Sequence, residues 1–85
     1  MNWNEEANQL LEELVKPIPA FVRPMAKKSI VNKVEHLAQE DGVEEVNQDC
    51  LIRGYILSSP EKDKERVLKV LQAKNIDLSP YKALL

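Results

Sequence analysis

Apolar residues recur every three or four positions through most of the chain, which is the spacing of one face of an α-helix. The pattern predicts helices at about residues 4–15, 24–41, 47–57 and 60–74, with a proline-rich turn at residues 17–24. Only short stretches such as Val43–Val46 are ambiguous between strand and loop. We therefore expect an all-α fold, in which about four helices form a single small domain.

The expected helix ends carry local signals. Asn4 and Asn47 are good residues for capping a helix N-terminus, and Gly42 suits the left-handed position after a helix C-terminus. The dipeptides Ser59-Pro60 and Ser79-Pro80 predict two further helix starts, the second for one last turn of the tail.

The apolar faces of the predicted helices define the expected core. Gly54 lies inside the third helix, where a glycine often allows a neighbouring helix to approach closely. We expect Trp3 and Phe21 to close the core, Cys50 to be a small buried thiol and His36 to be solvated. The remaining core positions are Ala7, Leu10, Leu11, Leu14, Val15, Ala26, Ile30, Val34, Leu37, Leu51, Ile52, Tyr55, Ile56, Val67, Val70 and Leu71, with Val31 and Ala38 beside those of the second helix.

Charge is distributed unevenly along a chain whose net charge is −2. Residues 16–36 carry five bases and one acid, whereas residues 1–15 and 37–50 carry acids and no base. Either the acidic flanks neutralise the basic segment within the fold, or the segment is a basic face for an anionic ligand or an acidic partner. The candidate interaction face consists of Arg23, Lys27, Lys28 and Lys33.

The residue types do not indicate catalysis on their own. His36 has no second histidine or cysteine at metal-binding spacing, and the single Cys50 cannot form an internal disulfide, an iron–sulfur site or a structural zinc site. Two glycines cannot build a phosphate-binding loop. We expect no catalytic residue, no cofactor and no metal in this chain, and leave open whether it belongs to an enzyme.

Hydropathy and net charge bear on location and partners. No apolar run approaches the roughly 20 residues of a spanning helix, and the start Met-Asn-Trp lacks the basic and apolar regions of a signal peptide. We expect a cytoplasmic location, no membrane span and, for a net acidic chain, no nucleic-acid partner. A larger protein is the expected partner, and the oligomeric state is left open.

Several pieces of the sequence, taken in order, resemble a known family. They begin with Trp3 and Ala7, continue with Pro19, Phe21, Val22 and Arg23, and end with Glu35, Ala38 and Gly42. Their order and spacing resemble the small helical domain at the C-terminus of the B subunit of light-independent (dark-operative) protochlorophyllide reductase. The resemblance covers residues 3–57 of the single domain 1–85, and residues 58–85 form an additional helix and tail.

That reductase is a nitrogenase-like oxidoreductase of chlorophyll and bacteriochlorophyll synthesis, and its cluster and substrate sites lie in large parts that this chain lacks. The resemblance therefore implies a stand-alone, non-catalytic protein-interaction module associated with photosynthesis. The alternative is an accessory subunit, in which Arg23 and lysines pair with tetrapyrrole carboxylates while Trp3 or Phe21 stacks on the ring. A weaker alternative is a nucleic-acid-binding helical domain. The motif residues also have structural interpretations, such as Arg23 reaching Glu35 or a helix C-terminal carbonyl.

Overall fold

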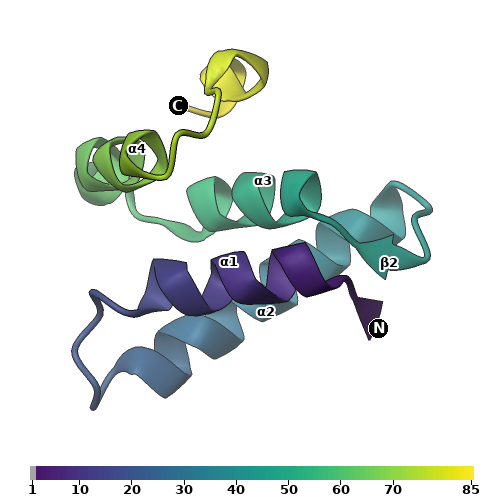
Figure 1. Ribbon diagram of the computed structural model, residues 1–85, viewed down its shortest axis with the longest axis horizontal. Coiled ribbons are helices and arrows are strands. Elements are labelled where there is room, and N and C mark those ends of the chain that lie inside the picture. Colours follow the sequence, from purple (N-terminus) through teal and green to yellow (C-terminus); the bar gives the residue numbers. More distant parts are fainter. Residues whose placement is uncertain (1) are drawn as a thin grey trace.

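Four α-helices carry most of the chain in the computed structural model, which describes residues 2–85 (Figure 1). There are also two short 3-10 helices. The first, η1 (Glu61–Asp63), comes just before the last α-helix, and the second, η2 (Ser79–Leu84), lies near the end of the chain. The α-helices are α1 (Glu5–Val15), α2 (Arg23–Glu40), α3 (Gln48–Ser58) and α4 (Lys64–Ala73). These bounds confirm the all-α prediction, although the expected helix 60–74 begins as a separate 3-10 turn.

The predicted cap residues explain where several helices begin and end. The side chain of Asn4 accepts a hydrogen bond from the Ala7 N–H at 2.8 Å, and that of Asn47 accepts one from the Cys50 N–H at 2.9 Å. Gly42 has a φ of 71°, as expected after a helix C-terminus. Ser59 does not cap a following helix: its hydroxyl donates to the Tyr55 carbonyl at 2.8 Å, because the last carbonyls of α3 lack helical partners.

A small parallel pairing that the sequence pattern does not predict joins two distant segments. Strand β1 (Asn2–Trp3) lies beside β2 (Glu45–Val46), with Asn2 opposite Glu45 and Trp3 opposite Val46. The indole N–H of Trp3 donates to the Glu35 carboxylate on α2 at 2.8 Å. These bonds fix the start of α1 against α2 and against the segment that leads into α3.

The core lies where α3 packs against α1 and α2 (Figure 1), and α4 and η2 add Val67, Leu71 and Tyr81 to it. A methyl group added at Gly54 would lie 2.3 Å from Cγ2 of Val34, so the glycine permits the close approach of α3 to α2, as predicted. The most deeply buried large side chains are Leu14, Val15, Val34, Val46, Leu51, Ile56, Val67 and Leu71. Cys50 is buried and His36 is exposed, both as expected.

Some expected core residues lie elsewhere. Phe21 is 85% exposed, so the prediction that it closes the core is wrong. The adjacent Val22 and the earlier Ile18 turn inward instead and are half-buried. Trp3 is half-buried and packs against the edge of the core. Ala26, Leu37 and Val70 are half-buried as well, because each lies at the border of its helix's apolar face.

Candidate functional site

The segment from Lys16 to Lys28, here called the tip, joins α1 to the first turns of α2 and projects from one end of the molecule (Figure 1). The side chains of Phe21 and Met25 are 85% and 75% exposed, although both are large and apolar. They are four residues apart, and in a helical register Lys28 continues the same line. Prolines at positions 17, 19 and 24 restrict the backbone around them.

Arg23 holds the tip together. Its guanidinium donates hydrogen bonds to the carbonyls of Val15 at 3.1 Å, Lys16 at 3.1 Å and Ile18 at 3.0 Å. These carbonyls lie at and just beyond the C-terminus of α1, where helical partners are missing and a positive charge is favourable. The prediction that Arg23 reaches a helix C-terminal carbonyl is confirmed. Pairing with Glu35 is wrong, because that carboxylate accepts the indole N–H of Trp3.

The predicted basic face is not a single surface. Arg23 is committed to backbone carbonyls, and Lys27 pairs with Glu12 of α1 at 2.5 Å. Lys28 and Lys33 are five residues apart, which places them roughly 140° apart around a helix. Lys28 and Lys16 are exposed, and no carboxylate among residues 2–85 forms an ion pair with either.

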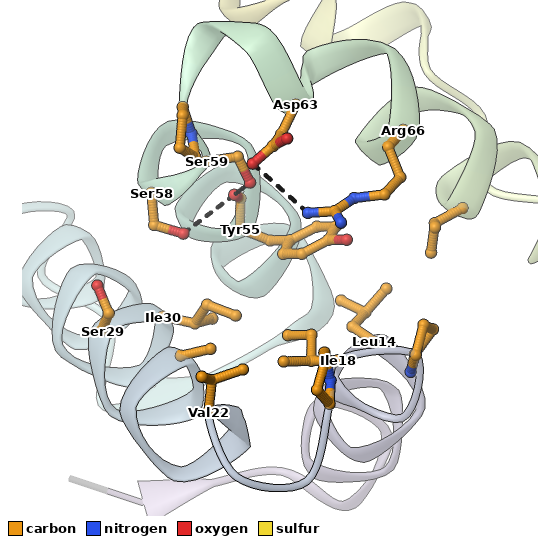
Figure 2. Close-up of a pocket in the computed structure, with 15 residues that line it drawn as sticks. Leu14, Ile18, Val22, Ser29, Ile30, Tyr55, Ser58, Ser59, Asp63 and Arg66 are labelled. Atoms are coloured by element: carbon orange, nitrogen blue, oxygen red, sulfur yellow. Dashed lines mark hydrogen bonds and ion pairs between the residues drawn. The ribbon is translucent and has the colours of Figure 1, made fainter.

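A groove of about 400 Å³ lies behind the tip, between the end of α1, the start of α2, the end of α3 and α4 (Figure 2). Its walls are mostly apolar and include Leu14, Ile18, Val22 and Ile30. The ring of Tyr55 lies across the groove, between these side chains and the guanidinium of Arg66. The groove is therefore a mostly apolar cleft, in which most polar groups lie on the side of α3 and α4 and Ser29 lies on the side of α2.

The polar groups of the groove are mostly paired within the protein. The hydroxyls of Ser58 and Ser59 donate to the Tyr55 carbonyl at 3.1 and 2.8 Å, and Arg66 pairs with Asp63 at 3.5 Å. The hydroxyls of Tyr55 and Ser29 form no hydrogen bond with any of the described residues, and that of Tyr55 reaches solvent. Burial raises the pKa of Tyr55.

Other polar clusters have structural explanations. Arg53 lies between Asp41 and Asp49, and its hydrogen bond to Asp41 raises the pKa of the guanidinium. The Tyr81 hydroxyl donates to Asp49 at 2.9 Å, which ties η2 to α3. His36 pairs with Glu40 on the exposed side of α2 at 2.8 Å. Within residues 2–85, no three His, Cys, Asp or Glu side chains are grouped to hold a metal ion.

The candidate face inferred from the sequence does not include Phe21 and Met25, the exposed large apolar residues of the tip. The run of five bases and no acid in residues 16–34 indicates a basic segment, but it does not indicate that these two side chains face outward. Met25 lies four residues after Phe21, so helical spacing places the two side chains on the same side. This spacing predicts that Met25 is exposed only if the outward orientation of Phe21 is already known. The groove has no comparable sequence signal, because its walls come from separate helices and turns.

Comparison with a curated relative bears on the setting of these sites. The chain is 41% identical over 83 residues to a protein named membrane protein YneK from Bacillus subtilis (strain 168). The match covers 98% of this chain and 58% of that relative, so the chain spans little more than half of the relative's length. In the part of this chain that the structure describes, every helix is too short or too polar to cross a bilayer. No solved structure gives a significant match.

These findings correct several expectations. The match to YneK contradicts the expected cytoplasmic location and the partners proposed with it, because the relative is named as a membrane protein. The resemblance to protochlorophyllide reductase is wrong, and so are the reductase-related interaction module, the tetrapyrrole-contacting subunit, the nucleic-acid alternative and the link to photosynthesis. Motifs such as the one from Pro19 to Arg23 are not specific to one family, because turns and helix caps recur in unrelated helical proteins. All residues, 1–85, match one family, and the chain belongs to that family, which is described as a protein of unknown function (DUF2621).

Proposed function

We propose that this chain is a membrane-surface domain that docks on the interface of an anionic bilayer through its tip. The observation that carries the proposal is the exposure of Phe21 and Met25, 85% and 75%, on a segment without acidic residues. Large apolar side chains gathered at one exposed place mark interaction surfaces in proteins. Aromatic and apolar residues combined with lysines are typical of segments that lie in a bilayer interface.

The apolar part of the tip supplies affinity. Moving an exposed phenylalanine or methionine side chain out of water contributes about 1.5–3 kcal/mol each. Because the prolines and Arg23 already hold the backbone of the tip, little conformational entropy is lost when these side chains insert. Contributions of this size give reversible docking rather than permanent anchoring.

The charged part of the tip selects the kind of bilayer. Lys16 and Lys28 are exposed and free of carboxylate partners among the described residues. Each lysine close to an anionic membrane surface contributes about 1 kcal/mol. Acidic phospholipids are therefore the expected partners, and binding should weaken as salt rises.

Similarity to YneK supports the same proposal. That relative is named a membrane protein, and the matched region covers 58% of its length. A membrane setting brings a bilayer surface close to this domain at all times. Under that condition, even the weak affinity of a two-residue apolar tip is sufficient to orient the domain.

Vesicle sedimentation tests the proposal. We expect the chain to bind vesicles made of an equal mixture of phosphatidylcholine and phosphatidylglycerol. It should bind vesicles of pure phosphatidylcholine more weakly. The double variant Phe21→Ser/Met25→Ser should lose about a hundredfold in affinity or more, since it removes two apolar contributions of about 1.5–3 kcal/mol. The variant Lys16→Glu/Lys28→Glu should lose the preference for phosphatidylglycerol.

Matched controls keep the result specific to the tip. Leu57 and Leu85 are also exposed apolar residues, at 40% and 38%, and they lie outside it. The variant Leu57→Ser/Leu85→Ser should bind as the unchanged chain does, and so should Lys62→Glu/Lys82→Glu. Equal binding by the tip variant and the unchanged chain, or no binding to either vesicle, would overturn the proposal.

A further inference from the structure

The sulfur atoms of this chain differ in their exposure to solvent. The sequence holds two methionines and one cysteine, which are Met1, Met25 and Cys50. Among the described residues, Met25 is 75% exposed, whereas Cys50 is 1% exposed. Oxidants dissolved in water reach an exposed sulfur, whereas a buried thiol is shielded from them. Within residues 2–85, Met25 therefore carries the sulfur that a small oxidant contacts.

The fold keeps this sulfur accessible without any opening of the structure. Met25 lies in the first turn of α2, and its neighbours Val22 and Ala26 take the inward positions beside the groove. The guanidinium of Arg23 holds this turn through its bonds to backbone carbonyls at and just beyond the end of α1. Because the side chain of Met25 lies outside the core, the folded state accommodates an added oxygen at its sulfur.

Oxidation at this position changes the chemistry of the docking surface. Methionine sulfoxide is polar, whereas the thioether is apolar. Phe21 and Met25 are the two large apolar side chains exposed on the tip, so oxidation removes one of two apolar contributions. A polar group that enters an apolar environment loses its hydrogen bonds to water, which opposes insertion. This consequence rests on the proposed docking of the tip on a bilayer.

We propose that Met25 is an oxidation site for hydroperoxides, and that its conversion to methionine sulfoxide releases the tip from the bilayer. In the reaction with hydrogen peroxide, the sulfur lone pair attacks one peroxide oxygen, and an S–O bond forms as the O–O bond breaks. The transferred oxygen loses its proton, which the other oxygen takes up as it leaves as water. The sulfur is thereby oxidised and the peroxide is reduced. Enzymatic reduction of the sulfoxide returns the thioether, so the change is reversible.

Peroxide treatment of the chain in the absence of vesicles tests the oxidation site. Mass spectrometry of proteolytic peptides should show that Met25 gains one oxygen at nearly the rate of N-acetylmethionine amide, while Cys50 remains unchanged. The melting temperature should stay the same, because the oxidised side chain lies outside the core. Oxidation of Met25 more than about tenfold slower than that of the model compound, or oxidation of Cys50 before Met25, would overturn the site.

Sedimentation with vesicles made of an equal mixture of phosphatidylcholine and phosphatidylglycerol tests the release. The chain oxidised at Met25 should bind at least about tenfold more weakly than the untreated chain. Met25→Leu keeps an apolar side chain of similar volume and retains Met1, so it should bind as the untreated chain does both before and after peroxide. Met25→Gln places a polar side chain at the same position and should bind as weakly as the oxidised chain.

The outcomes separate oxidation from docking. Equal binding by the oxidised and the untreated chain would overturn the release. A peroxide-dependent loss of binding in Met25→Leu would also overturn it, because another residue would then be responsible. If the untreated chain does not bind these vesicles, the proposed docking fails and the release fails with it, whereas the peptide measurement still decides whether Met25 is an oxidation site.

Discussion

Phe21 lies at the outside of the tip because the residues beside it occupy the inward positions. Ile18 and Val22 line the groove, and the N–H groups of Val22 and Arg23 bond to the carbonyl of Pro19 at 3.0 Å, which curls the chain with Phe21 outward.

Since the side chain of Phe21 is 85% exposed, Phe21→Ala should change the free energy of unfolding by less than about 0.5 kcal/mol. Chemical denaturation measures this. Leu14→Ala, at a position only 1% exposed, is the contrast and should cost about 2–5 kcal/mol. A comparable loss in both variants would show that Phe21 is part of the core.

Tyr81 supplies a pH-dependent prediction. Burial, followed by its hydrogen bond to Asp49 at 2.9 Å, raises the pKa of Tyr81 from 10.0 to about 12. A raised pKa means that the folded state favours the protonated phenol. The contribution of Tyr81 to stability is therefore complete below pH 10, and it is lost as the pH rises through about 12.

Ultraviolet absorbance of tyrosinate checks this prediction in a Tyr55→Phe background, where Tyr81 is the remaining tyrosine. The titration should be centred well above 10.0. Asp49→Asn should lower the pKa of Tyr81 without returning it to 10.0, because burial, the largest cause, remains. Titration of Tyr81 close to 10.0 in the Tyr55→Phe variant that keeps Asp49 would contradict the buried, bonded position of its hydroxyl.

The packing of α3 on α2 depends on Gly54. A Cβ at this position would lie 2.3 Å from Cγ2 of Val34 and 2.9 Å from its Cα, so the backbone as well as the side chain obstructs a methyl group. Gly54→Ala should therefore destabilise the fold by about 1–3 kcal/mol, as overpacked cores do, even though alanine favours helix by up to about 1 kcal/mol. Thermal unfolding followed by circular dichroism measures the difference. Leu57→Ala, at an exposed position of the same helix, should change stability little, and a stabilised Gly54→Ala would contradict the close approach.

Helix positions were predictable because their signals are local. Asn4, Asn47 and Gly42 determine helix ends through bonds or angles within a few residues, and the apolar spacing of each helix depends on that helix alone. The pairing of β1 with β2 was not predictable, since two-residue strands carry no alternation and lie more than 40 residues apart. The bond from Trp3 to Glu35 is equally non-local. Contacts between distant segments thus account for most of what sequence patterns missed.

At the scale of the whole molecule, the candidate sites were only partly predictable. The basic segment was visible in the sequence, but the contacts of its side chains were not. Arg23 caps α1, Lys27 pairs with Glu12, and Lys28 remains exposed. Outward orientation of Phe21 depends on how the turn between α1 and α2 folds. The groove depends on the placement of α3 and α4 against that turn (Figure 2). Both sites therefore arise from tertiary structure that no single segment encodes.

Docking of the tip on a bilayer would fix the orientation of the whole molecule relative to the membrane. The tip projects at one end of α1 and α2, whereas the paired strands and the turn at Gly42 lie at the opposite end of α2 (Figure 1). Docking through the tip would place Phe21 and Met25 in the interface. The acidic residues near Gly42, among them Asp41 and Glu44, would then lie away from an anionic surface that repels them.

The most direct measurement is paramagnetic relaxation of the backbone amides of the chain on anionic nanodiscs whose lipids carry a nitroxide in the acyl chain. Docking through the tip predicts strong line broadening for residues 20–26, and little for α4 and for the turn at Gly42. The same experiment on Phe21→Ser/Met25→Ser should show no localised broadening. Broadening centred on another element, or spread evenly over the chain, would contradict a membrane-docking tip.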